Sequence, residues 1–310
     1  MHGSREGEQM LGGLHASRLQ SMALLALAYL TAAALALAAV RLLPFSHPLA
    51  RALAADLVAT GCVFLFSFRL DNSSIYDPYW SVAPVALGAF WLASAQGQGD
   101  GMRQILVSAL VLWWALRLTL NCLWQWRGLQ HEDWRYRDLR RKLGAAYWPV
   151  SLLGIHLMPT LVVFAGCLPL YGALTARSRP FGSLDVVAAL VTAAAVWIES
   201  SADRQLRSAR AAAGETTGAS PALLHVSGLW AYSRHPNYFG EVLFWWGLSL
   251  FGLAASGPRW WLLAGPLVVT ALFLLVSIPM MERHLALRRP GYAEYQQRTS
   301  RLVPWFPKLV

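Results

Sequence analysis

The chain has 310 residues, of which 56% are hydrophobic and 14% are charged. Together with a mean hydropathy of +0.41, this composition excludes an ordinary water-soluble domain and indicates an integral membrane protein. The formal net charge of +10 belongs to no soluble, basic and aromatic-rich module, which argues against a nucleic-acid partner. The positive charge instead favours loops that set membrane topology.

The chain begins with a polar stretch and continues with apolar segments of membrane-spanning length. Residues 1–20 mix both charge signs with glycines, so we expect a mobile tail rather than a signal peptide. Residues 21–310 are predicted to form one all-α membrane domain of about seven to eight helices, with an N-terminal part at 21–126 and a C-terminal part at 127–310. Eight windows of span length lie near 21–43, 49–70, 79–95, 102–126, 150–174, 183–200, 236–256 and 259–280.

Basic residues gather in three of the predicted connections. They follow the fourth, sixth and last spans, at 127–142, 204–210 and 283–308. An even number of spans separates each basic segment from the next, so all three share one face, which the positive-inside rule places in the cytosol. This rule alone is enough to explain most of these arginines, although some of them also have nearby carboxylates.

The cysteines and the common catalytic motifs indicate no metal or nucleotide-loop chemistry. Cys62, Cys122 and Cys167 lie in apolar stretches without metal-ligand spacing, so we expect structural thiols and no metal site. The chain contains no HExxH, CxxC, GxSxG or P-loop pattern. The segment "GQGDG" follows no strand and is not expected to bind a dinucleotide.

A polar decapeptide, "YSRHPNYFGE", leads directly into one of the most apolar spans. Pro236 is suited to the first turn of a helix, so Arg234 and His235 should lie at the helix N-terminus, where anions bind well. Asn237 and Glu241 are four residues apart and share a helix face on which both side chains could bind one ligand. Gly240 would admit a flat ring or another backbone. The alternative is an interfacial cap whose polar residues meet lipid headgroups.

A second polar face is predicted where the sixth span leaves the membrane. Glu199, Asp203 and Arg207 repeat at intervals of four along "WIESSADRQLRSAR", which predicts a stripe of two acids and a base. A solvated helix end is the alternative interpretation.

The cytosolic stretch at 127–144 and the chain's C-terminal part carry further candidates. Asp133 is spaced to pair with Arg137, and Arg137 to neighbour Arg141, along a helix. Tyr136 lies between two arginines that could fix its hydroxyl or stabilise its ionised form. A plain loop is equally compatible with this stretch. The last segment, 279–307, contains too many aromatic residues for a disordered tail, so we expect it to fold back onto other cytosolic segments.

Several of these motifs together resemble the steroid 5-alpha-reductase-like membrane proteins, and specifically the branch called domain of unknown function 1295. The matching motifs are "LWAYSRHPNYFGEVLFWWGLSLFG", "EDWRYRDLR", Asp203 followed by "QLR", and "MERHLALRRPGYAEYQQRTSRLVPW". They cover roughly residues 70 to 306 in order. Sterol C14 and 7-dehydrocholesterol reductases share a similar Arg-His-x-Asn-Tyr-x-Gly pattern.

The resemblance implies a helical reductase that binds NADPH in a cytosol-facing cavity and reduces a C=C bond conjugated to a carbonyl in a lipid substrate. By position it assigns the nicotinamide and ribose region to Asn237, Glu199 and Asp203. It assigns the phosphates or the adenine end to Arg207, Arg234, His235 and Arg298, and the pocket walls to Tyr238, Glu241 and Tyr295. An endoplasmic reticulum or bacterial inner membrane would suit such a site, and no obligate protein partner is indicated.

The sequence departs from the steroid enzymes at their catalytic tyrosine. That tyrosine lies three residues before an arginine, where this chain has Trp114 before Arg117. Tryptophan cannot donate a proton as a phenol does, so Tyr136, Tyr79 and Asp77 are the candidate acids.

Two other functions stay open at this stage. One is a methyltransferase similar to the isoprenylcysteine carboxyl methyltransferases, which use S-adenosylmethionine and share the Arg-His-Pro-x-Tyr-x-Gly element. The other is a non-catalytic lipid-binding membrane protein.

Overall fold

The computed structural model describes residues 17–177, 179–212 and 227–308, and within them the chain is helical without any strand. An isolated bridge between Ser233 and Ser300 is the exception to the helical pattern in these residues. Most of the predicted tail at 1–20 lies outside the described residues. The chain forms two compact units, Met1–Trp80 with Leu118–Thr160 (unit 1) and Ser81–Arg117 with Leu161–Val310 (unit 2).

Seven helical segments of the described chain are long and apolar enough to cross a membrane, which confirms an all-α polytopic protein. They are Arg18–Leu42, Pro48–Arg69, Gly101–Gln125, Trp134–Thr175, Ser183–Ala212, Pro236–Ser256 and Trp261–Ala286.

The predicted span near 79–95 is instead a shorter helix. Helix α3, Tyr79–Ser94, has 16 residues and is therefore about 24 Å long, less than the roughly 30 Å of a bilayer's apolar core. Within unit 2 it packs on α8, Leu168–Thr175: Trp91 contacts Tyr171 with ring centroids 5.5 Å apart. Seven segments therefore have the length of a span, within the predicted range of about seven to eight helices, and α3 is a shorter eighth helix.

Unit 1 is built on two long apolar helices. They are α1, Arg18–Leu42, and α2, Pro48–Arg69, which pack against each other. The remaining elements of this unit are η1 (Ser73–Tyr76), the last turns of α4 (Gly101–Gln125), α5 (Trp134–Leu143), η2 (Gly144–Ala146), α6 (Tyr147–Ser151), the π-helical η3 (Leu152–Leu157) and the start of α7 (Met158–Gly166).

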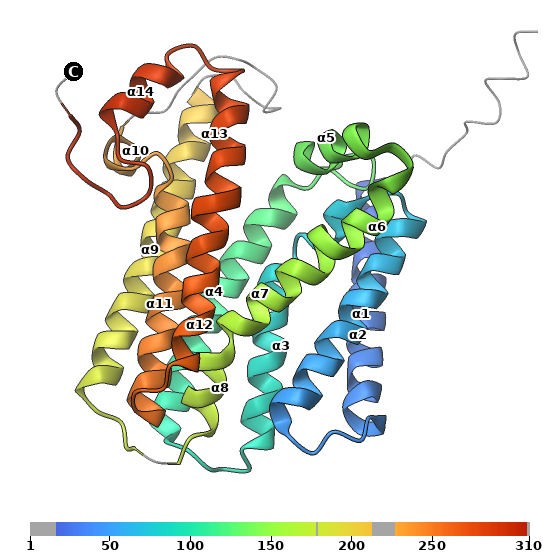
Figure 1. Cartoon of the computed structure of the whole chain (residues 1–310), viewed down its shortest axis with the longest axis vertical. Coiled ribbons are helices and arrows are strands. Elements are labelled where there is room, and N and C mark those ends of the chain that lie inside the picture. Colours follow the sequence, from blue (N-terminus) through green and yellow to red (C-terminus); the bar gives the residue numbers. More distant parts are fainter. Residues whose placement is uncertain (1–16, 178, 213–226, 309–310) are drawn as a thin grey trace, which may run out of the picture. The chain divides into compact units, whose positions relative to one another are not determined.

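Unit 2 is organised around α11, Pro236–Ser256, which packs against α8, α9 (Ser183–Ala212) and α12 (Trp261–Leu272) (Figure 1). The π-helical η4 (Phe273–Ser277) joins α12 to α13 (Ile278–Ala286), and the short helices α10 (Leu229–Tyr232) and α14 (Tyr292–Arg298) lie at one end of this bundle. Pro236 is the first residue of α11 and His235 its N-cap, as the sequence predicted.

Two glycines set the register of α9 against α11. A Cβ on Gly240 would lie 2.4 Å from Glu199 Cγ, and one on Gly247 would lie 2.3 Å from Thr192 Oγ1. Larger side chains would push the helices apart, so glycine permits this close approach. From the first contact to the second, the residue number rises on α11 and falls on α9, so the two helices are antiparallel. The polar start of α11 therefore lies against the polar end of α9.

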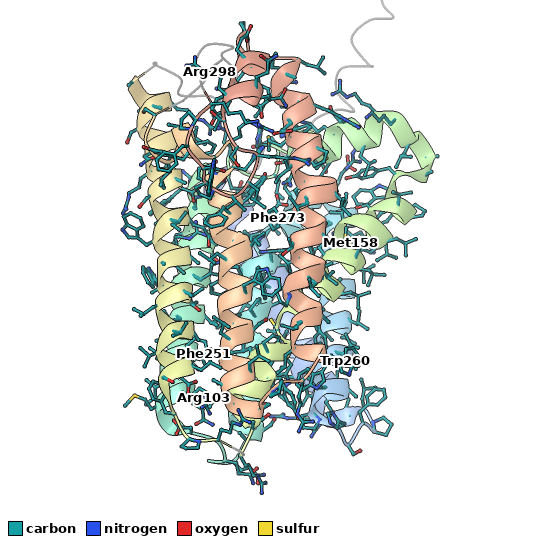
Figure 2. All side chains as sticks on the ribbon, turned by 60° about the vertical axis from the view of Figure 1, so that its left-hand side comes forward. Arg103, Met158, Phe251, Trp260, Phe273 and Arg298 are labelled. Carbon is teal, nitrogen blue, oxygen red and sulfur yellow. The ribbon has the colours of Figure 1, made fainter. Side chains whose placement is uncertain are left out.

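A buried ion pair fixes the opposite end of unit 2. Arg103 and Asp185 form a bidentate pair with N–O distances of 2.6 and 2.8 Å, and Arg103 also donates to the carbonyls of Arg179 and Pro180. Figure 2 shows Arg103 at the end of the bundle remote from Arg298. Both charges are fully buried, and their mutual pairing makes that burial tolerable.

Candidate functional site

The antiparallel packing of α9 and α11 brings three acidic side chains together in unit 2. Glu199 and Asp203 come from α9 and Glu241 from α11, and Arg117 of α4 donates to both Glu199 and Asp203, the latter at 2.8 Å. We call these four residues the acidic cluster. Glu199 interacts directly with Glu241. Glu199 and Asp203 of the predicted stripe are therefore packed against other helices, whereas Arg207 is exposed, so the alternative of a solvated helix end holds only for the last residue of the stripe.

Two indole N–H groups hold Glu241. Trp114 Nε1 donates to one carboxylate oxygen and Trp245 Nε1 to the other, each at 3.0 Å. Trp114 is completely buried and stacks on Phe244 with ring centroids 4.4 Å apart. Trp114 thus serves as a hydrogen-bond donor to a carboxylate.

The acidic cluster has hydrogen-bonding capacity that other described residues do not use. Glu199 Oε1 and Arg117 Nε are both buried and have no hydrogen-bond partner. Asn237, on the same face of α11 as Glu241, is partly buried, and its side-chain amide forms no hydrogen bond with the residues described. An unpaired acceptor on α9, an unpaired donor on α4 and an amide on α11 therefore belong to the three helices that form the acidic cluster, where unmet buried polar groups are costly.

The basic half of the decapeptide has a different environment. Arg234 donates to Glu282 at 2.8 Å and to the carbonyls of Gln296 and Thr299 at 2.8 and 2.6 Å. His235 Nε2 lies 3.3 Å from the same Glu282 carboxylate. Arg234 therefore ties the start of α11 to α13 and to the C-terminal segment, and most of its N–H groups are already used.

His235 is buried and stacks on Tyr238, with ring centroids 5.3 Å apart and planes within 8°. Burial lowers the pKa of His235, although the hydrogen bond to Glu282 opposes this effect. The imidazole is therefore mostly neutral near pH 7. The carboxylate of Glu282 balances the positive charge of Arg234.

The other predicted cofactor residues lie around these two groups. Tyr295 donates its hydroxyl to the Trp230 carbonyl at 2.5 Å. Arg207 interacts with Asp203, whereas Arg298 is exposed. The C-terminal segment does fold back, as predicted, since Arg234 N donates to Ser300 O at 2.8 Å and Trp305 N to Tyr232 O at 2.9 Å.

In unit 1, two of the three candidate acids are paired. The Tyr136 hydroxyl donates to Asp77 Oδ1 at 2.6 Å. Burial raises the pKa of Asp77 to about 6, against the opposing effects of Arg135 and Tyr136. Near neutral pH a fraction of this carboxyl therefore carries a proton, and the phenol is held in contact with it.

Tyr79, the third candidate, lies in a separate buried pair. Its hydroxyl donates to Asp56 Oδ1 at 2.6 Å, and burial raises the pKa of Tyr79 far above its usual value. Sequence reasoning missed Asp56, although a single acid inside the apolar window at 49–70 is a recognisable signal of a buried polar contact.

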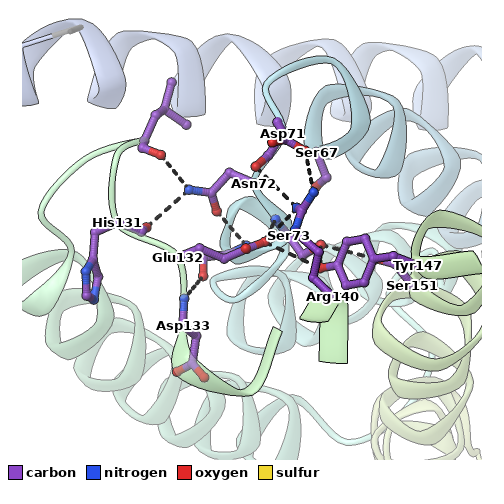
Figure 3. A network of polar contacts seen from close by, with 12 residues as sticks. Ser67, Asp71, Asn72, Ser73, His131, Glu132, Asp133, Arg140, Tyr147 and Ser151 are labelled. Atoms are coloured by element: carbon purple, nitrogen blue, oxygen red, sulfur yellow. Dashed lines mark hydrogen bonds and ion pairs between the residues drawn. The ribbon is translucent and has the colours of Figure 1, made fainter. Parts of the chain in front are cut away.

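A polar network joins η1 to the segment that precedes α5 (Figure 3). Asn72 donates to the carbonyls of Leu129 and His131 at 2.8 and 3.1 Å. Glu132 accepts the backbone N–H of Ser73 at 2.8 Å and interacts with Arg140 at 3.3 Å. These contacts fasten η1 to the segment that precedes α5. They hold Asp77, which follows η1, against Tyr136 near the start of α5.

The predicted pairing of Asp133 with Arg137 is wrong. Asp133 is the N-cap of α5, accepts the Arg135 N–H at 2.8 Å and forms an ion pair with the Arg135 guanidinium at 2.7 Å. Burial raises the pKa of Asp133, but Arg135 outweighs it, and the pKa falls below its usual value. A carboxylate at a helix N-cap turns toward the first free N–H groups, so it cannot also reach one turn along the helix.

Comparison with known proteins identifies a family. The model of the family described as "Protein of unknown function (DUF1295)" matches residues 63–299. Uncharacterized protein C594.04c of Schizosaccharomyces pombe is 27% identical over 252 residues, which cover 75% of this chain and 73% of that protein. No solved structure matches the chain.

Proposed function

The chain is a multi-pass membrane protein that belongs to the DUF1295 family, and we propose that it is an NADPH-dependent oxidoreductase that reduces an activated C=C bond of a lipid. The observation that carries this proposal is the unused hydrogen-bonding capacity, among the described residues, of Glu199 Oε1, Arg117 Nε and the Asn237 amide. Buried polar atoms without partners are rare in folded proteins and favour a ligand that supplies the missing bonds.

The chemistry of these atoms fits a nicotinamide carboxamide. Its NH₂ group requires an acceptor such as Glu199 Oε1, and its carbonyl requires a donor such as Arg117 Nε–H or the Asn237 amide. When bound, NADPH supplies a hydride for reduction of a conjugated double bond. Glu241, fixed by two indoles, serves in this proposal as a rigid wall beside Glu199.

The cationic groups fit a phosphate-bearing ligand only in part. Arg207 lies beside Asp203 near the end of α9 and is the basic residue that we assign to a cofactor phosphate. Arg234 is assigned a supporting role, because Glu282 and two backbone carbonyls already occupy its donors. His235 shares that role through its contact with Glu282.

The sequence-based candidates for a proton donor, Asp77 and Tyr136, form a pair within unit 1, and their part in the reaction stays a prediction. A phenol hydrogen-bonded to a carboxyl with a pKa of about 6 can both donate a proton and be reprotonated near neutral pH. Tyr79 is a weaker candidate, since its hydroxyl is engaged by Asp56 inside the helix packing of unit 1.

The test is ligand-induced stabilisation of the purified full-length protein by NADPH, NADH or S-adenosylmethionine. A ligand that binds only the folded state at about 100 times its Kd stabilises that state by about 2.7 kcal/mol. We expect NADPH to raise the unfolding temperature of the wild type, and this shift to vanish in Asn237→Ala and Glu199→Gln. Gln297→Ala, which removes an exposed amide from α14, is the matched control and should keep the shift.

The other outcomes separate the alternatives. Stabilisation by S-adenosylmethionine alone would identify a methyl-donor site, and the reductase proposal would fail. No stabilisation by any of the three would favour a non-catalytic lipid-binding protein. If NADPH binds, its consumption on addition of enone or enoyl lipids, compared between wild type and Tyr136→Phe, tests the proton donor.

A further inference from the structure

The C-terminal segment Thr299–Lys308 carries an exposed aromatic surface on a fixed backbone. Ser233 Oγ donates to Leu302 O at 2.7 Å, Trp305 N to Tyr232 O at 2.9 Å, and Lys308 N to Arg298 O at 2.9 Å. These bonds leave Trp305 and Phe306 70% and 75% exposed. The segment is therefore an ordered element that displays large apolar side chains.

Neighbouring side chains extend this surface. Phe306 contacts the ring of Tyr232 at 6.2 Å, Tyr232 is itself 43% exposed, and Val303 is 59% exposed. Exposed aromatic side chains that lie together favour an interaction surface, whereas a single exposed apolar residue would not. We call Tyr232, Val303, Trp305 and Phe306 the aromatic patch.

The segment that carries the aromatic patch is basic. Arg298, Arg301 and Lys308 are exposed, and 295–308 contains no Asp or Glu, although the exposed Glu294 comes directly before it. In unit 2 the patch lies at the end of the bundle where α10 and α14 lie and where α11 begins (Figures 1 and 2). Tyr232 comes shortly before Pro236, the first residue of a membrane-spanning helix, so the patch lies at the depth of a membrane surface.

We propose that the aromatic patch is a membrane-interface anchor that inserts into the headgroup region of the bilayer that the protein spans, with Arg298 and Lys308 binding anionic phospholipids. Tryptophan and tyrosine favour this depth because their rings are apolar and their N–H or O–H groups remain hydrated. Basic side chains at an anionic surface each contribute about 1 kcal/mol, which corresponds to about a fivefold change in an equilibrium constant. Arg298, which the family resemblance would place at a cofactor phosphate, is thereby assigned to lipid.

Hydroxyl-radical footprinting of the full-length protein in single-copy nanodiscs tests this proposal, because the radical is neutral and reports side-chain exposure directly. Nanodiscs of phosphatidylcholine are compared with nanodiscs that also contain phosphatidylglycerol. We expect Trp305 and Phe306 to be oxidised more slowly in the anionic discs. Arg298→Gln and Lys308→Gln should each lower the equilibrium constant between the inserted and the exposed state of the patch by about fivefold. Lys142→Gln removes an exposed charge from unit 1 and should change nothing.

Equal oxidation in both lipids, at the rate of a freely exposed tryptophan, would overturn the proposal. In a parallel set of nanodiscs that hold two copies, protection that is absent from the single-copy discs would also overturn it, because the patch would then bind a second copy. If Arg298→Gln abolishes NADPH stabilisation but leaves Trp305 oxidation unchanged, Arg298 belongs to the cofactor and not to lipid. The anchor does not depend on the proposed reductase activity, so either can fail alone.

Discussion

Replacement of Gly240 by alanine should show how far the candidate site in unit 2 depends on the close packing of α9 and α11. The new Cβ would lie 2.4 Å from Glu199 Cγ, 2.9 Å from Ala195 O and 3.1 Å from Glu199 N. Two of these three atoms belong to the α9 backbone and cannot rotate away, so α9 and α11 must move apart by roughly 1 Å to restore normal contacts. Overpacking of this kind costs about 1–3 kcal/mol.

The same movement would displace Glu199 from the acidic cluster. We therefore expect Gly240→Ala to lower the unfolding temperature of the detergent-purified protein and also to weaken NADPH binding, although no ligand-contacting atom is removed. Gly61→Ala is the matched control, because a Cβ added at Gly61 would meet no atom within 4 Å. Alanine is the better helix former by about 0.5–1 kcal/mol, so this control should unfold at the same temperature or higher and bind NADPH as the wild type does.

Thermal unfolding and NADPH titration of both variants would decide the question. If Gly240→Ala unfolds at the wild-type temperature, the close approach of α9 and α11 is not a stability requirement. If it is destabilised but binds NADPH with unchanged affinity, Glu199 is not part of the ligand site.

Three further predictions concern single charges. Asp77 has a pKa raised to about 6 in the folded protein, so the folded state binds the proton more tightly than the unfolded state. Stability should therefore fall as pH rises from about 4 to about 6, by at most about 3 kcal/mol; Asp77→Asn should flatten this pH profile of the unfolding temperature. Asp185→Asn leaves Arg103 buried without its partner and should lower the free energy of unfolding by about 3–5 kcal/mol. The double variant Arg103→Met with Asp185→Leu should restore part of that loss, measured by denaturant unfolding. Glu282→Gln should cost about 1.5–3 kcal/mol by weakening its bonds to Arg234, and should speed proteolysis of the C-terminal segment.

The long apolar helices were predictable from the sequence because bilayer thickness fixes their length. The N-terminus of α11 was also predictable, since Pro236 has no N–H to lose at a first helical turn. The window at 79–95 forms a helix as predicted, but apolar content alone does not fix its length, and at 16 residues α3 is shorter than the seven candidate spans.

The candidate site was predictable only in part. The spacing of Glu199 with Asp203, and of Asn237 with Glu241, predicts which side chains share a helix face. It does not predict which helices face each other, because the pairing of α9 with α11 depends on the close approaches at Gly240 and Gly247. The bond between Tyr136 and Asp77 spans 59 positions, so no local pattern could have predicted it.

The contacts of Arg234 divide the decapeptide into a structural part, which contains Arg234, and a candidate ligand-binding part, which contains Asn237. A cation at the start of a membrane-spanning helix invites assignment to a phosphate, yet Arg234 is bound by Glu282 and by the carbonyls of Gln296 and Thr299. Its loss would release the C-terminal segment and α13, so stability and every ligand affinity would fall together. Asn237 forms no such bonds with the part of the chain that the structure describes, so its substitution should affect a bound ligand with little change in stability. A loss of binding in an Arg234 variant therefore cannot identify a cofactor contact, whereas the same loss in an Asn237 variant of wild-type stability can.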